Sequence, residues 1–182
     1  MVKIYELKLT NLQQRILRLL FIKAGISLNA HNIARALNVS QPAVMKALPY
    51  LEKEELITIF QDKESKRWSI ELNRENHKVI QLKRVDNLKL IYELGLADFL
   101  ETEFAGAVII LFGSYSYGED TINSDIDIAI VGRKEKSFDL EKFENLFGKE
   151  IKINFYESFS KINKNLRSNL FNGIVLSGRI NL

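Results

Sequence analysis

Two strand patterns, a glycine–serine turn and a pair of acids occupy residues 107–131, which read AVIILFGSYSYGEDTINSDIDIAIV. The first six residues of this stretch are all apolar, as is typical of a strand buried in the middle of a sheet. That run ends abruptly at Gly113 and Ser114. The second apolar run begins with Asp125 and Asp127, which are two residues apart and therefore point to the same face of the expected strand.

The acid pair and the turn together point to phosphate chemistry. Two carboxylates side by side on a strand repel each other and raise a pKa, so stability alone does not favour such a pair. A divalent cation resolves the repulsion, and hard oxygen ligands suit Mg²⁺. A glycine where a strand turns into a short helix lets backbone N–H groups approach an anion closely. A phosphate cradle beside a metal-binding acid pair is typical of a phosphoryl-transfer site.

These residues also carry a family resemblance. The motif Phe112-Gly113-Ser114-Tyr115-Ser116-Tyr117-Gly118, followed by Ser124-Asp125-Ile126-Asp127, resembles the signature of the nucleotidyltransferase superfamily related to DNA polymerase β, and it is most similar to the small "minimal nucleotidyltransferase" branch. The resemblance covers about residues 85–182. A loop with a chance Asp-x-Asp is the alternative interpretation.

The resemblance implies a function and assigns roles to four residues. Gly113 and Ser114 are expected to hold the phosphates of an NTP, with ATP as the expected nucleotide. Asp125 and Asp127 are expected to be the catalytic acids that hold Mg²⁺. The implied reaction is transfer of a nucleoside monophosphate to a protein or small-molecule acceptor. A helical protein partner is implied as well, because members of the small branch often act in toxin–antitoxin pairs.

A third acid is expected on a following strand in this family, where it helps to bind the catalytic metal and to activate the attacking hydroxyl. The candidate strand is 150–156, and the sequence predicts that the position of the third acid falls on Asn154. A neutral amide cannot act as a general base and is a poorer metal ligand than a carboxylate. Glu150 could substitute only with another register, and Glu157 only with a bulge. Two functions therefore stay open: an active nucleotidyltransferase, and a catalytically weak or inactive, antitoxin-like transcription regulator.

The first half of the chain has the element order of a winged helix-turn-helix. Apolar spacing predicts three helices and then two strands, at 11–23, 27–37, 41–54, 56–60 and 68–72. The third helix follows Ser40, which is a good N-cap, and has Pro42 in its first turn. The stretch 33–44 resembles the helix-turn-helix core of small bacterial and archaeal repressors, and the resemblance covers about residues 10–75.

DNA contacts are expected from the third helix and from the hairpin that follows it. Short polar groups for base edges and one cation for phosphate come from Ser40, Gln41, Ala43 and Lys46. Cations for the neighbouring DNA backbone come from Lys63, Lys66 and Arg67. Residues 1–75 hold 12 basic and 8 acidic side chains, a balance that permits a polyanion partner. A winged helix that binds protein rather than DNA is the alternative.

A helical connector is expected between the two halves, with Gly95 as a break. An apolar stripe follows its helical spacing: Val79, Leu82, Val85, Leu88, Ile91 and Leu94. The stripe is either plain core or the contact surface of a homodimer.

Composition limits the remaining function classes. The 182 residues contain no cysteine, which excludes disulfides, thiolate zinc sites and cysteine nucleophiles. No apolar run approaches the roughly 18 residues of a membrane helix, and no signal-peptide core is present, so a cytoplasmic protein without membrane contact is expected. The sequence predicts an α+β protein with a winged helix-turn-helix domain at 1–75, a connector at 76–104 and a nucleotidyltransferase-like mixed sheet flanked by helices at 105–182.

Overall fold

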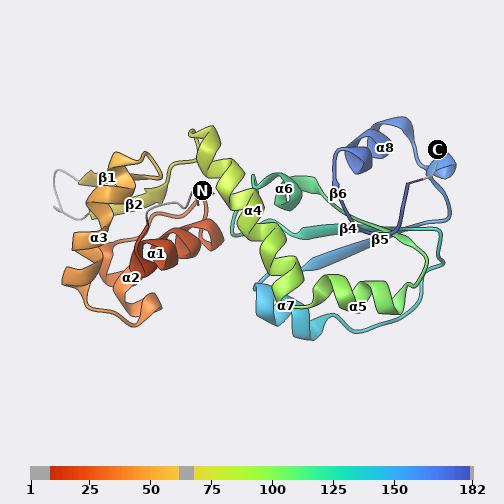
Figure 1. Ribbon diagram of the computed structural model, residues 1–182, viewed down its shortest axis with the longest axis horizontal. Coiled ribbons are helices and arrows are strands. Elements are labelled where there is room, and N and C mark those ends of the chain that lie inside the picture. Colours follow the sequence, from red (N-terminus) through yellow and green to blue (C-terminus); the bar gives the residue numbers. More distant parts are fainter. Residues whose placement is uncertain (1–8, 62–67, 181–182) are drawn as a thin grey trace, which may run out of the picture. The chain divides into compact units, whose positions relative to one another are not determined.

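A computed structural model describes residues 9–61 and 68–180 of the chain. The chain divides into two compact units, Met1–Val79 and Ile80–Leu182. The first unit combines helices with a two-stranded sheet, and the second combines helices with a four-stranded mixed sheet (Figure 1). The predicted α+β class is therefore confirmed.

Each of the three helices of the first unit begins at a polar cap. Helix α1 (Asn11–Ile22) follows Thr10, which forms a capping box with Gln13. Helix α2 (Ala30–Leu37) begins after Asn29, and helix α3 (Gln41–Lys53) begins after Ser40. In each case the cap side chain accepts a hydrogen bond from a backbone N–H that has no partner within the helix. The caps fix where these helices start.

A small antiparallel sheet completes the first unit. Strands β1 (Ile57–Gln61) and β2 (Trp68–Leu72) pair with Ile57 opposite Leu72, and Leu28 adds an isolated bridge to Ile70. The core beneath them is apolar and includes Ile16, Leu20, Ile33, Val44, Leu51 and Ile70. This arrangement is the predicted winged helix-turn-helix. The predicted DNA contacts Lys63, Lys66 and Arg67 lie outside the described residues.

The second unit is built on a sheet of order β5-β4-β3-β6. Its strands, in chain order, are β3 (Val108–Phe112), β4 (Ile126–Val131), β5 (Ile151–Tyr156) and β6 (Ile174–Ser177). Strand β3 pairs antiparallel with β4 and with β6, whereas β4 and β5 run parallel. A parallel pair needs a crossover, and the segment between β4 and β5 supplies it with helix α7 (Glu141–Phe147). The two central strands, β3 and β4, carry the acid pair and the turn.

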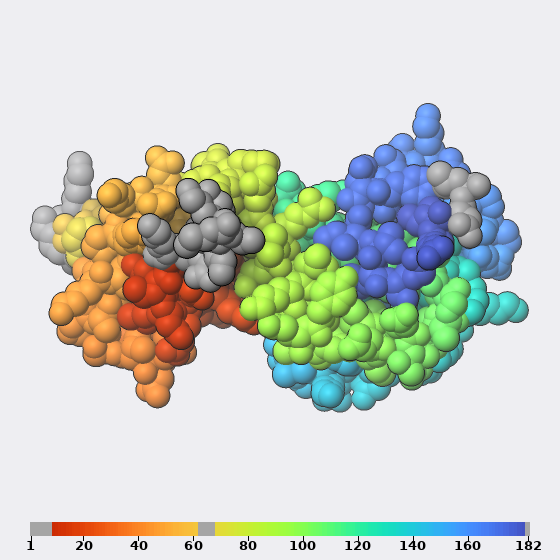
Figure 2. All heavy atoms as spheres, in the orientation of Figure 1, coloured from red at the N-terminus to blue at the C-terminus, as the bar shows by residue number. Residues whose placement is uncertain are grey.

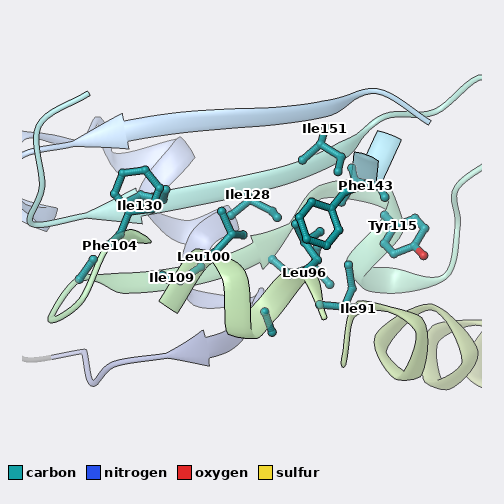
Figure 3. Packing of buried hydrophobic residues seen from close by; sticks show 14 residues of the cluster. Ile91, Leu96, Leu100, Phe104, Ile109, Tyr115, Ile128, Ile130, Phe143 and Ile151 are labelled. Carbon is teal, nitrogen blue, oxygen red and sulfur yellow. The ribbon is translucent and has the colours of Figure 1, made fainter. Parts of the chain in front are cut away.

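Helices cover both faces of this sheet (Figure 1). On one face, helices α4 (His77–Glu93), α5 (Leu96–Glu103) and α7 contribute to a core with Ile109, Ile128 and Ile130 of the strands. Figure 3 shows the labelled side chains of this core filling the space between α5 and the sheet. On the other face, helix α8 (Lys164–Phe171) packs on Ile110 and Ala129. The alternation of β4 therefore places Ile126 and Ile128 in the first core and turns Asp127 to the α8 face.

The segment 76–104, expected as a connector, holds α4 and α5. Ile91 of α4 and Leu96 and Leu100 of α5 are fully buried members of the second unit's core. The left-handed Gly95 separates the two helices, as its place in the sequence predicts. The apolar stripe of this segment thus contributes core residues to the second unit, although Val85 is largely exposed.

The segment 158–172 is not one continuous helix. The structure instead has a short 3-10 turn, η1 (Phe159–Lys161), followed by α8. Ile162 is extended and buried, and the Asn163 side chain accepts a hydrogen bond from the backbone N–H of Leu166 at 2.9 Å. Because Asn163 is an N-cap, the helix begins there. None of the helices in the described ranges is both long and apolar enough to cross a membrane.

Candidate functional site

The glycine–serine turn lies where β3 ends and the short helix α6 (Gly113–Tyr117) begins. Gly113 has φ +72°, a left-handed conformation that favours glycine. A Cβ at this position would overlap the Asp127 carboxylate. The hydroxyl of Ser116 donates to the carbonyl of Gly113 at 2.8 Å and closes the turn. The absence of a side chain at Gly113 is therefore what lets the acid lie against the turn.

The two predicted acids lie at the start of β4, beside this turn. Asp127 is the register partner of Phe112, the residue before Gly113. Asp125 immediately precedes the strand and is 32% exposed. Both are partly buried, as is Ser114. The structure thus brings Gly113, Ser114, Asp125 and Asp127 together, as the sequence predicts.

A lysine lies beside the acid pair, and the sequence analysis missed it. In the parallel register of β4 and β5, Asp127 is opposite Lys152. The Lys152 ammonium donates to Oδ2 of Asp125 at 2.5 Å. Asn154, on which the sequence predicts the third position to fall, is opposite Ala129, one pleat farther along the strand. Lys152 and Asn154 share a face, so only the register distinguishes them.

The electrostatics of the three side chains are coupled. Burial, and then the neighbouring Asp125 carboxylate, raise the pKa of Asp127, while Lys152 partly offsets this rise. The hydrogen bond to Asp125 raises the pKa of Lys152 in turn. The cluster thus combines two carboxyl groups with one ammonium group. The repulsion expected between the acids is present, and a lysine of the same sheet offsets part of it.

A buried polar cluster fixes the loop between α6 and β4, and it too was missed. Asp120 is only 2% exposed and forms ion pairs with Lys83 of α4, which is 1% exposed, and with Lys149, at 3.4 Å. Asn87 donates to Asp120 at 2.7 Å and to the carbonyl of Tyr115 at 2.9 Å. The Asp120 carboxylate thus joins α4 to the residues just before β5, and Asn87 joins α4 to α6.

The same cluster reaches the residue before the acid pair. The Lys149 ammonium donates to the carbonyls of Thr121, at 2.5 Å, and of Ser124, at 3.0 Å. Ser124 directly precedes Asp125. The cluster therefore positions the first acid through its backbone. No local pattern in the sequence could reveal it, because Lys83 and Asp120 are 37 residues apart.

In the first unit, the residues predicted to contact DNA gather at the start of α3. The Ser40 hydroxyl accepts from the N–H of Ala43 at 3.3 Å and caps the helix. Gln41 and Lys46 are exposed, and Ala43 is half-buried. The side chains of the first turns therefore face solvent on a helix whose opposite side holds the buried Val44 and Leu48.

Family models match both units. The model of the MarR family matches residues 9–68, and the model of the nucleotidyltransferase domain matches residues 95–176. The chain joins a MarR-type winged-helix domain to a nucleotidyltransferase domain. No curated protein is detectably similar to the chain.

Several solved structures of regulators are similar to part of the chain. The MepR–DNA complex of S. aureus is 24% identical with a TM-score of 0.39, and the match covers 52% of this chain and 77% of that one. A ZitR variant of Lactococcus lactis is 25% identical with a TM-score of 0.42, over 57% and 68% of the two chains. Free MepR, described as a transcription regulator of the multidrug efflux pump MepA, is 27% identical with a TM-score of 0.41, over 53% and 69%. Because all three TM-scores are below 0.5, the assignment of the two domains depends on the family models.

The acid pair of the nucleotidyltransferase domain fits one kind of metal ion and not another. One or two carboxylates plus substrate phosphates are a usual ligand set for Mg²⁺, so Asp125 and Asp127 fit the ion that accompanies a triphosphate. The catalytic ion that a third acid helps to bind is a different case, because Lys152 lies beside Asp127. Among the residues that the structure describes, no three His, Cys, Asp or Glu side chains are placed to hold a metal.

The two glutamates that flank β5, Glu150 and Glu157, do not supply a third acid beside the pair. Glu150 is exposed one pleat before Lys152 and acts on the Lys152 ammonium electrostatically. Glu157 lies beyond the other end of β5, where it pairs with Lys161. The donor set around the nucleotidyltransferase motif is thus two aspartates and a lysine.

Proposed function

We propose that the chain is a DNA-binding transcription regulator whose nucleotidyltransferase domain binds an NTP with Mg²⁺ and does not transfer the nucleotide. The observation that carries this proposal is Lys152 beside the Asp125–Asp127 pair, on the strand where the family resemblance implies a third acid. A lysine that is ion-paired to Asp125 is protonated and cannot accept a proton from an attacking hydroxyl.

Nucleotide binding is proposed from the groups around the turn. Gly113 and Ser114 offer backbone N–H groups to phosphate oxygens, and Asp125 and Asp127 would hold the Mg²⁺ that the nucleotide brings. When bound, the ion neutralises phosphate charge. Lys152 lowers the negative charge that a triphosphate meets at this site and can pair with phosphate itself. Binding then needs no third carboxylate, whereas activation of an acceptor hydroxyl does.

A labelled-nucleotide experiment separates binding from transfer. The native chain is incubated with labelled ATP, Mg²⁺ and host lysate, and ATP binding is measured in parallel by equilibrium dialysis. We expect saturable binding without covalent transfer of label. Transfer by the native chain that is lost in an Asp125→Asn/Asp127→Asn variant would establish the enzyme instead, with a protein or small molecule as acceptor.

Two single substitutions test whether Lys152 stands where a third metal-binding acid would be needed. Lys152→Asp places a third carboxylate beside Asp127, and we expect it to strengthen binding of Mn²⁺, used as a spectroscopic substitute for Mg²⁺. Asn154→Asp is the matched control, because it adds the same acid to the same strand face opposite Ala129. An equal gain of Mn²⁺ affinity in the two variants would contradict the assigned role of Lys152.

DNA binding is proposed for the MarR-type domain from the exposed start of α3. Ser40 and Gln41 supply polar groups, Ala43 supplies a small apolar side chain beside them, and Lys46 supplies a phosphate contact. Lys46→Glu is therefore expected to weaken binding to duplex DNA and to reduce the salt slope by about 1 in fluorescence-anisotropy titrations. Lys53→Glu, at the far end of the same helix, is the control and is expected to change little. If DNA binding by the native chain does not depend on salt, a protein partner for this domain is favoured.

A further inference from the structure

A cavity of the nucleotidyltransferase domain lies away from the acid pair. It is open, has a volume of about 740 Å³, and is lined by residues at the start of β3, the end of β4 and the segment 157–179. That segment forms a continuous part of the visible surface of this unit (blue in Figure 2). Val131 lines the cavity and is four residues from Asp127 on β4, which is roughly 13 Å at about 3.3 Å per residue. The cavity is therefore distinct from the proposed triphosphate site.

Three arginines line this cavity: Arg133, Arg167 and Arg179. In the described part of the chain, none of them forms an ion pair with a carboxylate. The one acid in the lining, Glu157, is bound by Lys161, and this contact lowers the pKa of Glu157. Three like charges around one cavity repel each other, and a bound anion would remove that repulsion.

Two glycines, Gly106 and Gly178, leave the room in which Arg133 and the chain before Arg179 lie. The Arg133 guanidinium donates to the carbonyls of Gly132, at 2.8 Å, and of Ala105. A Cβ on Gly106 would meet its Nη2 at 2.5 Å, so glycine leaves the room that this arginine occupies. A Cβ on Gly178 would likewise meet the carbonyl of Ala107 at 2.5 Å. Gly178 thus lets the chain before Arg179 lie directly against β3.

An aromatic wall stands beside the cations. Phe159 and Phe171 line the cavity with ring centroids 5.5 Å apart, and Phe171 is 41% exposed. Ser158 and Ser160 add hydroxyl groups to the lining. Guanidinium groups suit phosphate oxygens, and exposed aromatic rings suit the face of a nucleobase. The volume is in the range of small-molecule sites.

We propose that this cavity is a second ligand site, which binds a mononucleotide with its phosphate on the arginines and its base against Phe159 and Phe171. This site needs no divalent ion, because the three guanidinium groups supply the positive charge. It is independent of the proposed NTP site at Asp125 and Asp127. A regulator with two nucleotide sites on one domain can respond to a nucleoside monophosphate and a triphosphate separately.

Calorimetric titration of the full chain with AMP in EDTA tests the proposal, since the chelator removes any binding that depends on Mg²⁺. We expect saturable binding with one site per chain. Arg167→Glu/Arg179→Glu should weaken it at least about tenfold, and the neutral pair Arg167→Gln/Arg179→Gln should weaken it in the same direction. Circular dichroism checks that each variant is folded, and the neutral pair keeps the test valid if charge reversal prevents folding.

Matched controls separate this cavity from general charge and from the other site. Lys134→Glu/Lys164→Glu makes the same change of net charge at exposed positions outside the lining, and it should keep AMP affinity within about threefold at physiological salt. Asp125→Asn/Asp127→Asn should keep AMP affinity and lose only NTP–Mg²⁺ binding. Phe171→Leu should lower the affinity for AMP but leave the affinity for inorganic phosphate unchanged.

Four results would overturn the proposal. They are no saturable binding at millimolar AMP, equal losses in the arginine pair and the lysine control, loss of AMP binding in the aspartate pair, and phosphate binding as tight as AMP binding. The third result would show that AMP binds at the acid pair. The fourth would show that the aromatic wall takes no part.

Discussion

Replacement of the buried carboxylate Asp120 is expected to cost the second unit a large part of its stability. Asp120→Asn keeps the shape of the side chain, and the new amide oxygen can still accept the hydrogen bond from Asn87. The negative charge is what disappears. With it goes the carboxylate that contacts the ammonium groups of Lys83 and Lys149, which are 1% and 6% exposed.

The magnitude follows from that burial. Removal of one partner from a buried ion pair costs about 3–5 kcal/mol, because the remaining charge stays desolvated. A domain is stable by about 5–15 kcal/mol in total, so the loss is about a third to a half of a mid-range stability of about 10 kcal/mol. The matched control is Glu93→Gln, which breaks the Lys89–Glu93 pair on α4, whose side chains are 56% and 49% exposed. An exposed i,i+4 pair contributes about 0.3–0.5 kcal/mol.

Urea denaturation with two probes measures both variants. Circular dichroism follows the whole chain, while the single tryptophan, Trp68, reports on the first unit. We expect Asp120→Asn to lower the urea midpoint of the dichroism transition strongly and Glu93→Gln to leave it almost unchanged. A cost below about 1 kcal/mol for Asp120→Asn would refute the reasoning, because it would mean that the two ammonium groups are hydrated or neutral in the folded state.

Three further predictions test other parts of the structure. Burial and Asp125 raise the pKa of Asp127, so the stability that protonated Asp127 contributes is full at low pH and is lost as the pH rises through the raised pKa. Asp127→Asn should therefore raise the melting temperature in thermal denaturation at pH 7, and near pH 3 the variant and the native chain should melt at the same temperature. Gly113→Ala should lower the free energy of unfolding by more than the about 1–2 kcal/mol of left-handed strain, because the new Cβ overlaps the Asp127 carboxylate. Its control is Gly148→Ala, where φ is +62° and the space around the Cβ is open, so urea titrations should show the loss from strain alone. Ser40→Ala removes the cap of α3 and should cost about 1 kcal/mol in the Trp68 transition, and no measurable loss would mean that water replaces the cap.

The central part of the second unit is readable from sequence because its signals are local. A continuous apolar run predicts β3, and the alternation at Asp125–Asp127 predicts which face of β4 carries the acids. The structure also explains why position 113 is a glycine, because a side chain there would overlap the Asp127 carboxylate. The winged helix-turn-helix is readable in the same way from its caps and from the spacing of its apolar residues.

The neighbour of the acid pair is not readable in this way. Strand β5 is separated from β4 by a crossover that includes α7, and nothing in the two strand sequences fixes their mutual register. A shift by two residues keeps every side chain on its face, so alternation predicts equally well that Lys152 or Asn154 is opposite Asp127. Alternation therefore predicts the face that Lys152 and Asn154 share, and the register of β4 and β5 decides which of them is opposite Asp127.

The Asp120 cluster shows a second kind of limit. Lys83 lies on a helix and Asp120 in a loop, and charged residues at such places are ordinarily exposed. They become buried only because α4 packs beside α6 and the start of β5 in the folded unit. This contact joins residues that are far apart in the chain, so composition and periodicity carry no trace of it.

The burial of Asp127 against Gly113 and the buried lysines around Asp120 both favour the proposal that the acid pair binds a ligand. Asp127 is held against Gly113 in a partly buried place that raises its pKa, and two lysines are buried to hold the loop before Asp125. Neither arrangement improves packing, and apolar side chains of similar volume would be at least as stable there. Departures of this kind from the best stability occur at functional sites. Lys152 lies on the strand where the family resemblance implies a third acid, so these costs favour the proposed binding of a ligand at Asp125 and Asp127.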